Sequence, residues 1–81
     1  MEKVMERIFK MMEGIESDPN YAIKSYMLGQ IAGSISKGKS VWTIQGYADG
    51  SGEILEEILD ELEVSYKTLT CQDNIYTISF N

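Results

Sequence analysis

The residues that decide the fold are GSISKGKSVWTIQGY, at positions 33–47. The segment Val41–Tyr47 is rich in β-branched and aromatic residues, which predicts a β-strand. Before it, Lys37–Lys39 has a glycine at its centre, as many turns do. We therefore expect a first β-hairpin, in which Ser34–Ser36 forms a short first arm and 41–47 forms the second.

Two helices are expected before this hairpin. Seven apolar side chains recur at steps of three and four between Met1 and Ile15, with charged residues on the opposite side, as in an amphipathic helix. The segment Ser17–Asn20 ends that helix. Asp18 or Ser17 can cap the second helix, with Pro19 in its first position, so that this helix is expected over about residues 19–32.

The chain after the hairpin predicts one more helix and one more hairpin. Residues 49–52 break the chain, and Ser51 can cap a helix whose apolar stripe is formed by Ile54, Leu55, Ile58, Leu59 and Leu62. Val64–Thr70 and Ile75–Phe80 are expected strands, and the second alternates apolar with polar residues, which buries one face of the sheet.

The expected fold class is therefore α+β, in the order helix, helix, β-hairpin, helix, β-hairpin. Residues 1–81 form a single domain, with a four-stranded antiparallel sheet that helices cover on one face. Residues 1–16 are an extra N-terminal helix, and residues 19–81 are an αββαββ core.

Composition excludes several kinds of chemistry. The 81 residues include no His and one Cys, and they carry a formal charge of −6. Without His there is no imidazole base or imidazole metal ligand, and Cys71 has no His partner to activate it as a nucleophile. The glycine-rich segment 49–52 lacks the lysine of a phosphate-binding loop. Asp49 and Glu53 are interpreted as a turn residue and an early-helix acid. We expect no enzyme, no catalytic residue, no metal and no cofactor.

The chain also predicts a location. No apolar stretch approaches the roughly 18 residues that a spanning helix needs, and the charged opening segment is unlike a signal peptide. A lone thiol fits a reducing compartment. We expect a cytoplasmic protein with no membrane association.

Negative charge is concentrated in the second half of the chain. Residues 49–81 carry eight acids against Lys67 alone, and most of them fall on the expected third helix. Such carboxylates form either a solvated helix face or an acidic strip that meets a basic groove on a partner. With so few cations on the expected sheet, direct nucleic-acid binding is not expected. The candidate partner-binding residues are Glu53, Glu56, Glu57, Asp60 and Glu61.

Small residues recur along the expected second helix. A glycine inside a helix costs about 1 kcal/mol relative to alanine, so a packing reason is expected. One interpretation is close packing within the chain, and the other is a two-fold symmetric helix pair in a homodimer. The candidate dimer residues are Ala22, Ser25, Gly29, Ala32 and Gly33. Trp42, in the first strand, is interpreted as a core residue, with a base-stacking or interface role as the alternative.

The segment Tyr26–Ile35, YMLGQIAGSI, resembles the signature helix of the LAGLIDADG homing endonucleases, and the expected element order over about residues 20–81 is similar to that family's core. The resemblance implies helices of two copies packed through small residues, and a sheet that lies on DNA. The family's metal-binding acid is missing between Gly33 and Ser34, so the resemblance implies no nuclease activity here.

Taken together, the sequence predicts a small, acidic, non-enzymatic interaction protein. The expected function is that of a phage-type inhibitor, of the anti-CRISPR or another anti-defence class, which binds a nucleic-acid-handling protein through its acidic surface. The alternative is a degenerate LAGLIDADG-like DNA-binding or regulatory homodimer without nuclease activity.

Overall fold

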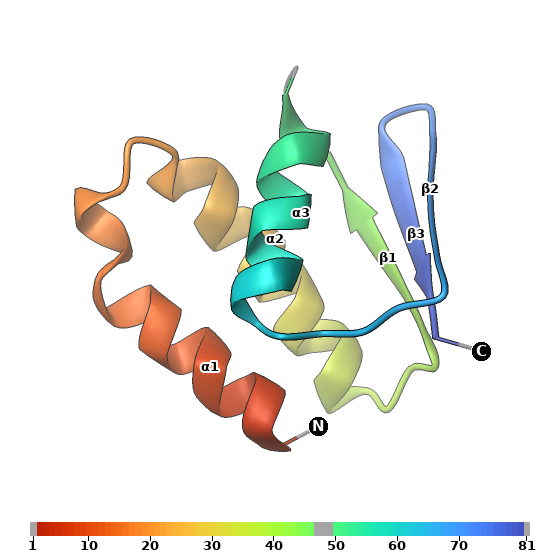
Figure 1. Cartoon of the computed structure of the whole chain (residues 1–81), viewed down its shortest axis with the longest axis horizontal. Coiled ribbons are helices and arrows are strands. Elements are labelled where there is room, and N and C mark those ends of the chain that lie inside the picture. The colour runs from red at the N-terminus through yellow and green to blue at the C-terminus, as the bar shows by residue number, and fades with distance from the viewer. Residues whose placement is uncertain (1, 47–49, 81) are drawn as a thin grey trace.

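A computed structural model describes residues 2–46 and 50–80 of the chain. Within these ranges it contains three α-helices, one 3-10 turn and three strands (Figure 1). In chain order these are α1 (Glu2–Glu13), η1 (Ile15–Ser17), α2 (Tyr21–Ser36), β1 (Val41–Gln45), α3 (Ser51–Glu61), β2 (Thr68–Gln72) and β3 (Ile75–Ser79).

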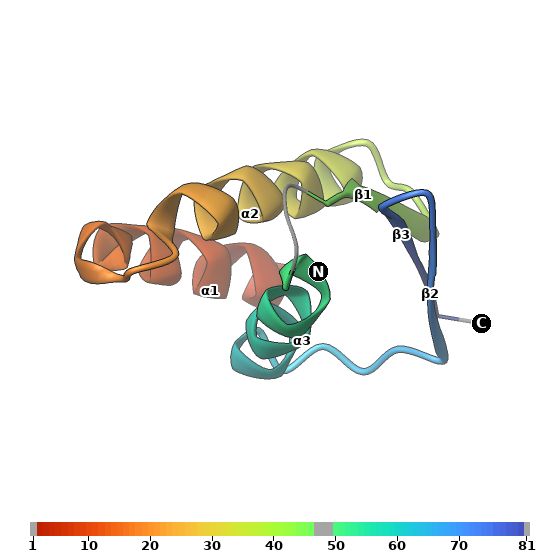
Figure 2. The ribbon, with the colours of Figure 1, turned by 90° about the horizontal axis from the view of Figure 1, so that it is seen from above.

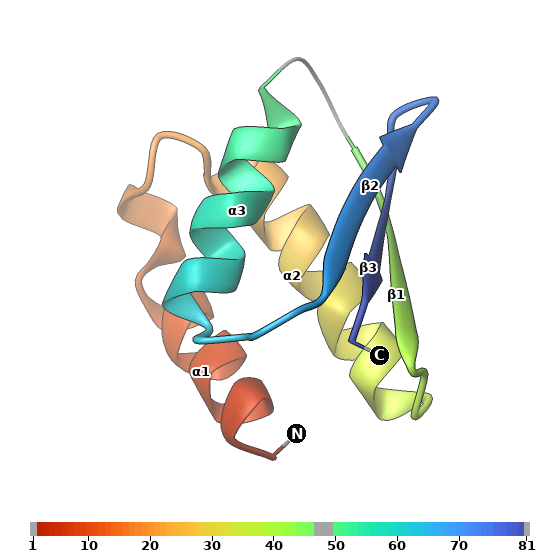
Figure 3. The ribbon, with the colours of Figure 1, turned by 45° about the vertical axis from the view of Figure 1, so that its right-hand side comes forward.

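The three strands form one antiparallel sheet in the order β1-β3-β2 (Figure 3). Trp42 of β1 lies opposite Ile78 of β3, which lies opposite Leu69 of β2. The helices all lie on one side of this sheet (Figure 2). The expected α+β class and one-sided covering are therefore confirmed, and β1 and β2 are the two edge strands.

The expectation of a four-stranded sheet is wrong, because Ser34–Ser36 continues α2 instead of forming a strand. The Ser34 hydroxyl donates to the Gln30 carbonyl one turn earlier, at 3.0 Å. The helix then ends in a Schellman motif, in which the Lys39 N–H donates to the Ser34 carbonyl and the Gly38 N–H to the Ile35 carbonyl. Gly38 has a φ of +66°, so it serves as a left-handed helix cap and not as a hairpin turn. The core order is consequently αβαββ.

Other helix and strand boundaries also differ from the expected ones. Helix α2 begins at Tyr21 after Asn20, and the Asp18 side chain accepts the Asn20 N–H without capping the helix. Ser51 is the first residue of α3, and Gly50 stands in the capping position. Strand β2 begins at Thr68, four residues after the expected Val64. The expected strand end Tyr47 and the acid Asp49 lie outside the described residues.

The core lies between the sheet and the helices. Trp42 is 1% exposed, and its ring meets Phe80 edge to face, with the centroids 4.6 Å apart. Trp42 is therefore a core residue, as the sequence predicts, and it offers no surface for stacking bases. The other almost fully buried apolar side chains come from all three helices, from the residue after α3 and from two strands: Ile8, Met27, Leu28, Ile31, Ile44, Leu55, Ile58, Leu59, Leu62 and Ile78.

A buried lysine of α2 forms ion pairs with the turn before the helix and with α3. The Lys24 Nζ lies 2.7 Å from the Asp18 Oδ2 and 3.9 Å from the Glu57 Oε2. The hydrogen bond from Lys24, together with one from the Asn20 N–H, lowers the pKa of Asp18. The same hydrogen bond raises the pKa of Lys24, against the opposing effect of burial. Both groups are therefore charged at neutral pH and hold the start of α2 against the turn before it.

This pair predicts a specific pH dependence for the variant Asp18→Asn. A carboxyl whose pKa falls on folding stabilises the fold above its ordinary value of 3.8, and this contribution disappears as the pH drops through the lower folded value. Lys24 contributes below 10.5 and loses its contribution as the pH rises through its higher folded value. Urea denaturation should show Asp18→Asn to be less stable than the wild type at pH 7, with the difference shrinking toward pH 2. The exposed Asp60→Asn is the control, and a difference that persists at pH 2 would contradict a titration effect.

Candidate functional site

The five carboxylates of the expected acidic strip all lie on α3, and all five are exposed. They are Glu53, Glu56, Glu57, Asp60 and Glu61. The 3.9 Å contact with Lys24 offsets part of the charge of Glu57. The structure thus brings the strip together on one accessible helix, an arrangement that suits a partner-binding surface and a solvated helix face equally.

The small residues of α2 do not form one uniform surface. Ala22 and Gly29 are exposed, whereas Ser25, Ala32 and Gly33 are half-buried, and Ala32 packs against the core. A Cβ added at Gly29 or Gly33 would meet no other heavy atom within 4 Å. Close packing within the chain therefore does not explain either glycine. A homodimer through α2 stays a prediction.

The open space at Gly29 predicts that Gly29→Ala stabilises the protein. The residue is inside a helix and in ordinary helical conformation, so alanine reduces the entropy of the unfolded chain and causes no steric clash. We expect a gain of about 1 kcal/mol in the free energy of unfolding, measured by urea denaturation. A loss of stability would contradict the open position of this residue.

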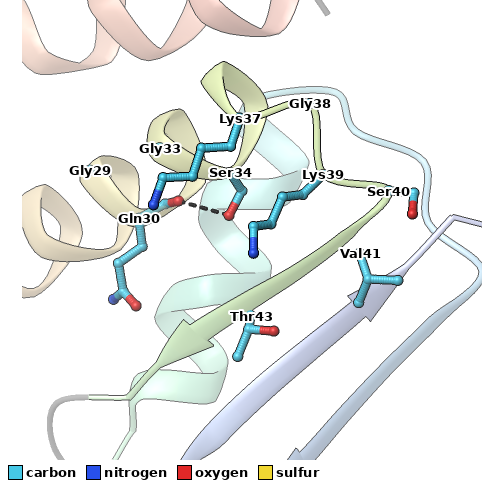
Figure 4. A pocket seen from close by; sticks show the side chains of 10 residues that line it. All are labelled: Gly29, Gln30, Gly33, Ser34, Lys37, Gly38, Lys39, Ser40, Val41 and Thr43. Carbon is cyan, nitrogen blue, oxygen red and sulfur yellow. Dashed lines mark hydrogen bonds between the residues drawn. The ribbon is translucent and has the colours of Figure 1, made fainter.

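The two glycines lie on one wall of a groove of about 850 Å³ between α2 and β1. The groove continues past the helix end along Lys37–Ser40 and is bounded on the other side by Val41 and Thr43. In Figure 4 the Lys39 side chain extends over the space between the helix and the strand, and the Lys37 side chain runs back along α2 toward Gln30. No acidic residue lines this groove, so it is a positively charged feature on an acidic protein.

The wall formed by β1 is a strand edge with peptide groups directed at the groove. The Gln45 N–H donates to the Gln30 Oε1 at 2.8 Å, and the Gln30 Nε2 donates to the Gln45 carbonyl at 3.2 Å. The next residue, Gly46, faces the opposite way, because its N–H donates to the carbonyl of Asn74, the residue before β3. Because the direction of peptide groups alternates along a strand, those of Thr43 and Val41 point the same way as those of Gln45.

In the part of the chain that the structure describes, no hydrogen bond pairs the outward N–H and C=O groups of Thr43 and Val41. An edge of this kind is a template for a further strand. The sequence interpretation missed Gln30, Lys37 and Lys39 as site residues. The only signal for the lysines is that two of the seven cations flank one glycine.

The other candidate groups are the acidic side chains, Cys71 and its neighbours in the sheet. Among residues 2–46 and 50–80, no three acidic, Cys or His side chains come together as a metal site. Cys71 is exposed and lies opposite Tyr76 in the sheet. Burial raises the pKa of the Tyr76 hydroxyl, and Cys71 adds to this effect. No helix within those ranges has both the length and the apolarity that a bilayer crossing requires.

The chain was compared with protein-family models, with curated proteins and with solved structures. None of the three comparisons finds a match. The LAGLIDADG resemblance therefore stays a prediction, and the structure has one strand fewer after α2 than the element order that the resemblance implies.

Proposed function

We propose that this protein is a non-enzymatic protein-binding module that accepts an extended polypeptide segment in the groove between α2 and β1. The segment adds to the sheet as a strand beside β1, which is an established mode of peptide recognition. The observation that carries the proposal is the set of outward peptide groups of Thr43 and Val41, which face a groove and have no partner in the described residues.

The shape of the groove supports this mode of binding. The glycines of α2 leave space for the side chains of an incoming strand, because neither position has a Cβ and nothing else fills the space. At one end, the Gln30 side chain already occupies both peptide groups of Gln45, much as a residue of a neighbouring strand would. The available edge is therefore short, and it suits a segment that pairs with two residues of β1.

The variant Thr43→Pro tests strand addition. Proline removes the N–H that faces the groove, and that N–H plays no part in the pairing with β3. The matched control Thr43→Val keeps the N–H and the β-branched shape. The probes are fluorescein-labelled heptapeptides in which Thr alternates with Val and the central residue is varied. We expect the peptides to bind the wild type and Thr43→Val, and to shift the NMR signals of the Val41 and Thr43 amides. We expect no binding to Thr43→Pro.

A second variant covers the case in which Thr43→Pro does not fold. Gly33→Leu places a side chain in the groove at a position with free space and favours helix formation, so the fold should persist while binding is lost. Ala22→Leu, on the same helix outside the groove, is its control. Failure of every heptapeptide to bind the wild type would contradict the proposal. Concentration-dependent dimerisation that Gly33→Leu abolishes would also contradict it, because the occupant would then be a second copy.

A second candidate function is the one that the sequence predicts, a phage-type inhibitor that acts through an acidic surface. The specific observation in its favour is that all five carboxylates of the strip are exposed on α3. The test is competition with duplex DNA for a panel of purified RNA-guided nucleases. The wild type should displace DNA, and a variant with Glu56, Glu57, Asp60 and Glu61 changed to Lys should not. Equal displacement of DNA by the two proteins would show that the acidic strip is not the binding surface.

A further inference from the structure

We infer that the segment bound beside β1 carries an acidic side chain at one defined position, the residue opposite Trp42. This inference rests on the proposed function, because it concerns the same groove. It adds the chemistry of the partner: an extended segment with a glutamate or aspartate between two residues that pair with Thr43 and Val41.

The position of the acid follows from the alternation of side chains in a sheet. Val41 and Thr43 are exposed on the outer face, whereas Trp42 between them is buried on the helix side. A strand added at this edge continues the same alternation across the sheet. Its residues that pair with Val41 and Thr43 point outward. The residue between these two, opposite Trp42, points to the side of the sheet where α2 lies.

On that side, the incoming side chain meets the wall of the groove that α2 forms, in which two positions are glycines. Gly33 and Gly29 line the groove, and a Cβ at either position would touch nothing. Space of this kind admits a side chain with several carbon atoms. The fold itself gains nothing from these glycines, since each one weakens the helix. Their presence is explained if a partner's side chain uses the space.

The charge around this space selects the side chain. Lys37 and Lys39 both line the groove, with the Lys39 side chain between α2 and β1 and the Lys37 side chain along α2 (Figure 4). Within residues 2–46 and 50–80, neither ammonium group lies within 4.0 Å of a carboxylate, whereas Lys24 and Arg7 are both paired. A carboxylate that enters between helix and strand therefore meets two unpaired cations, and a lysine in its place meets two like charges.

The outer face of the sheet determines which residues are preferred on either side of the acid in the bound segment. Thr43 lies opposite Thr77, and Val41 lies opposite Ser79, so this side of the sheet is uncharged near the edge. The residues of the bound segment that lie beside Thr43 and Val41 therefore need no particular charge, and β-branched or hydroxyl side chains pack well there. The preferred segment is thus an acid flanked on both sides by residues such as Thr or Val.

The test compares three labelled heptapeptides, TVTETVT and its versions with Gln or Lys in the centre, by fluorescence anisotropy at low salt. We expect the Glu peptide to bind about tenfold more tightly than the Lys peptide, with the Gln peptide between them, since exposed ion pairs contribute modestly. The double variant Lys37→Glu with Lys39→Glu should reverse this order. The control Lys10→Glu with Lys67→Glu has the same net charge and alters exposed lysines outside the groove, so it should keep the order.

The outcomes separate the two proposals. Equal affinity for the three peptides, combined with loss of binding in Thr43→Pro, would overturn the acidic preference and leave strand addition intact. The inference would also be overturned if the preference for the Glu peptide persisted in the variant Lys37→Glu with Lys39→Glu. The same holds if the variant Lys10→Glu with Lys67→Glu lost this preference, because the acid would then be recognised outside the groove. If no peptide binds the wild type, strand addition fails and this inference fails with it.

Discussion

Replacing Trp42 by alanine is expected to lower the free energy of unfolding by about 4 kcal/mol, within the range observed for truncating a buried aromatic side chain. The indole is 1% exposed, packs edge to face against Phe80 and lies opposite Ile78 of the central strand β3. A domain of this size is typically stable by about 4–12 kcal/mol. The variant should therefore be marginally folded or unfolded at 25 °C.

Urea denaturation followed by far-ultraviolet circular dichroism measures this effect, because the variant has no tryptophan to report by fluorescence. Trp42→Phe keeps an aromatic ring in the core and should cost less than the alanine variant. Tyr21→Ala, at an exposed position on α2, should change stability by less than about 0.5 kcal/mol. A cost for Trp42→Ala as small as that for Tyr21→Ala would contradict the placement of Trp42 in the core.

Replacing Gly46 by alanine is expected to destabilise the protein by about 2 kcal/mol, in the range for overpacking a filled site. A Cβ at this buried position would overlap the Asn74 side chain and would lie 2.9 Å from the Tyr76 Cε2. The backbone cannot retreat freely, because the Gly46 N–H donates to the Asn74 carbonyl at 2.7 Å. The same chemical change at Gly29, where the space is open, is expected to have the opposite sign.

A double-mutant cycle identifies the cause of this loss. Asn74 has a φ of +63°, a conformation that glycine adopts readily, so Asn74→Gly should be tolerated on its own. Adding Asn74→Gly to Gly46→Ala removes the side chain that the new methyl group overlaps, and it should recover part of the lost stability. The Tyr76 contact remains in the double variant. If the two effects simply add, the steric explanation is wrong.

The helices and the burial pattern of the sheet could be predicted, because both depend on local periodicity. The apolar repeat through Val4 and Ile8 predicts α1, and the alternation around Ile78 predicts which face of β3 is buried. The end of α2 could not be predicted in the same way. A glycine such as Gly38 fits a hairpin turn and a helix cap equally well, and the choice depends on whether Ser34 continues the helix.

The candidate site shows the same limit of sequence reasoning. The acidic strip on α3 follows from residue spacing along one helix, so its position could be predicted. The groove depends on contacts between residues far apart in the chain, such as Gln30 with Gln45, and on which edge of β1 is free. The expected hairpin would have paired a strand over residues 34–36 with β1. The error in the strand count therefore also concealed the groove.

The amide of Gln30 has a consequence for how the protein behaves at high concentration. Sheets with long uncovered edges tend to join edge to edge, and repeated joining leads to amyloid-like fibrils. By pairing with both the N–H and the C=O of Gln45, Gln30 shortens the uncovered part of β1, so that less of this strand is left to pair with the edge of another molecule's sheet. One side chain thus limits how far a sheet of another molecule can pair along this edge.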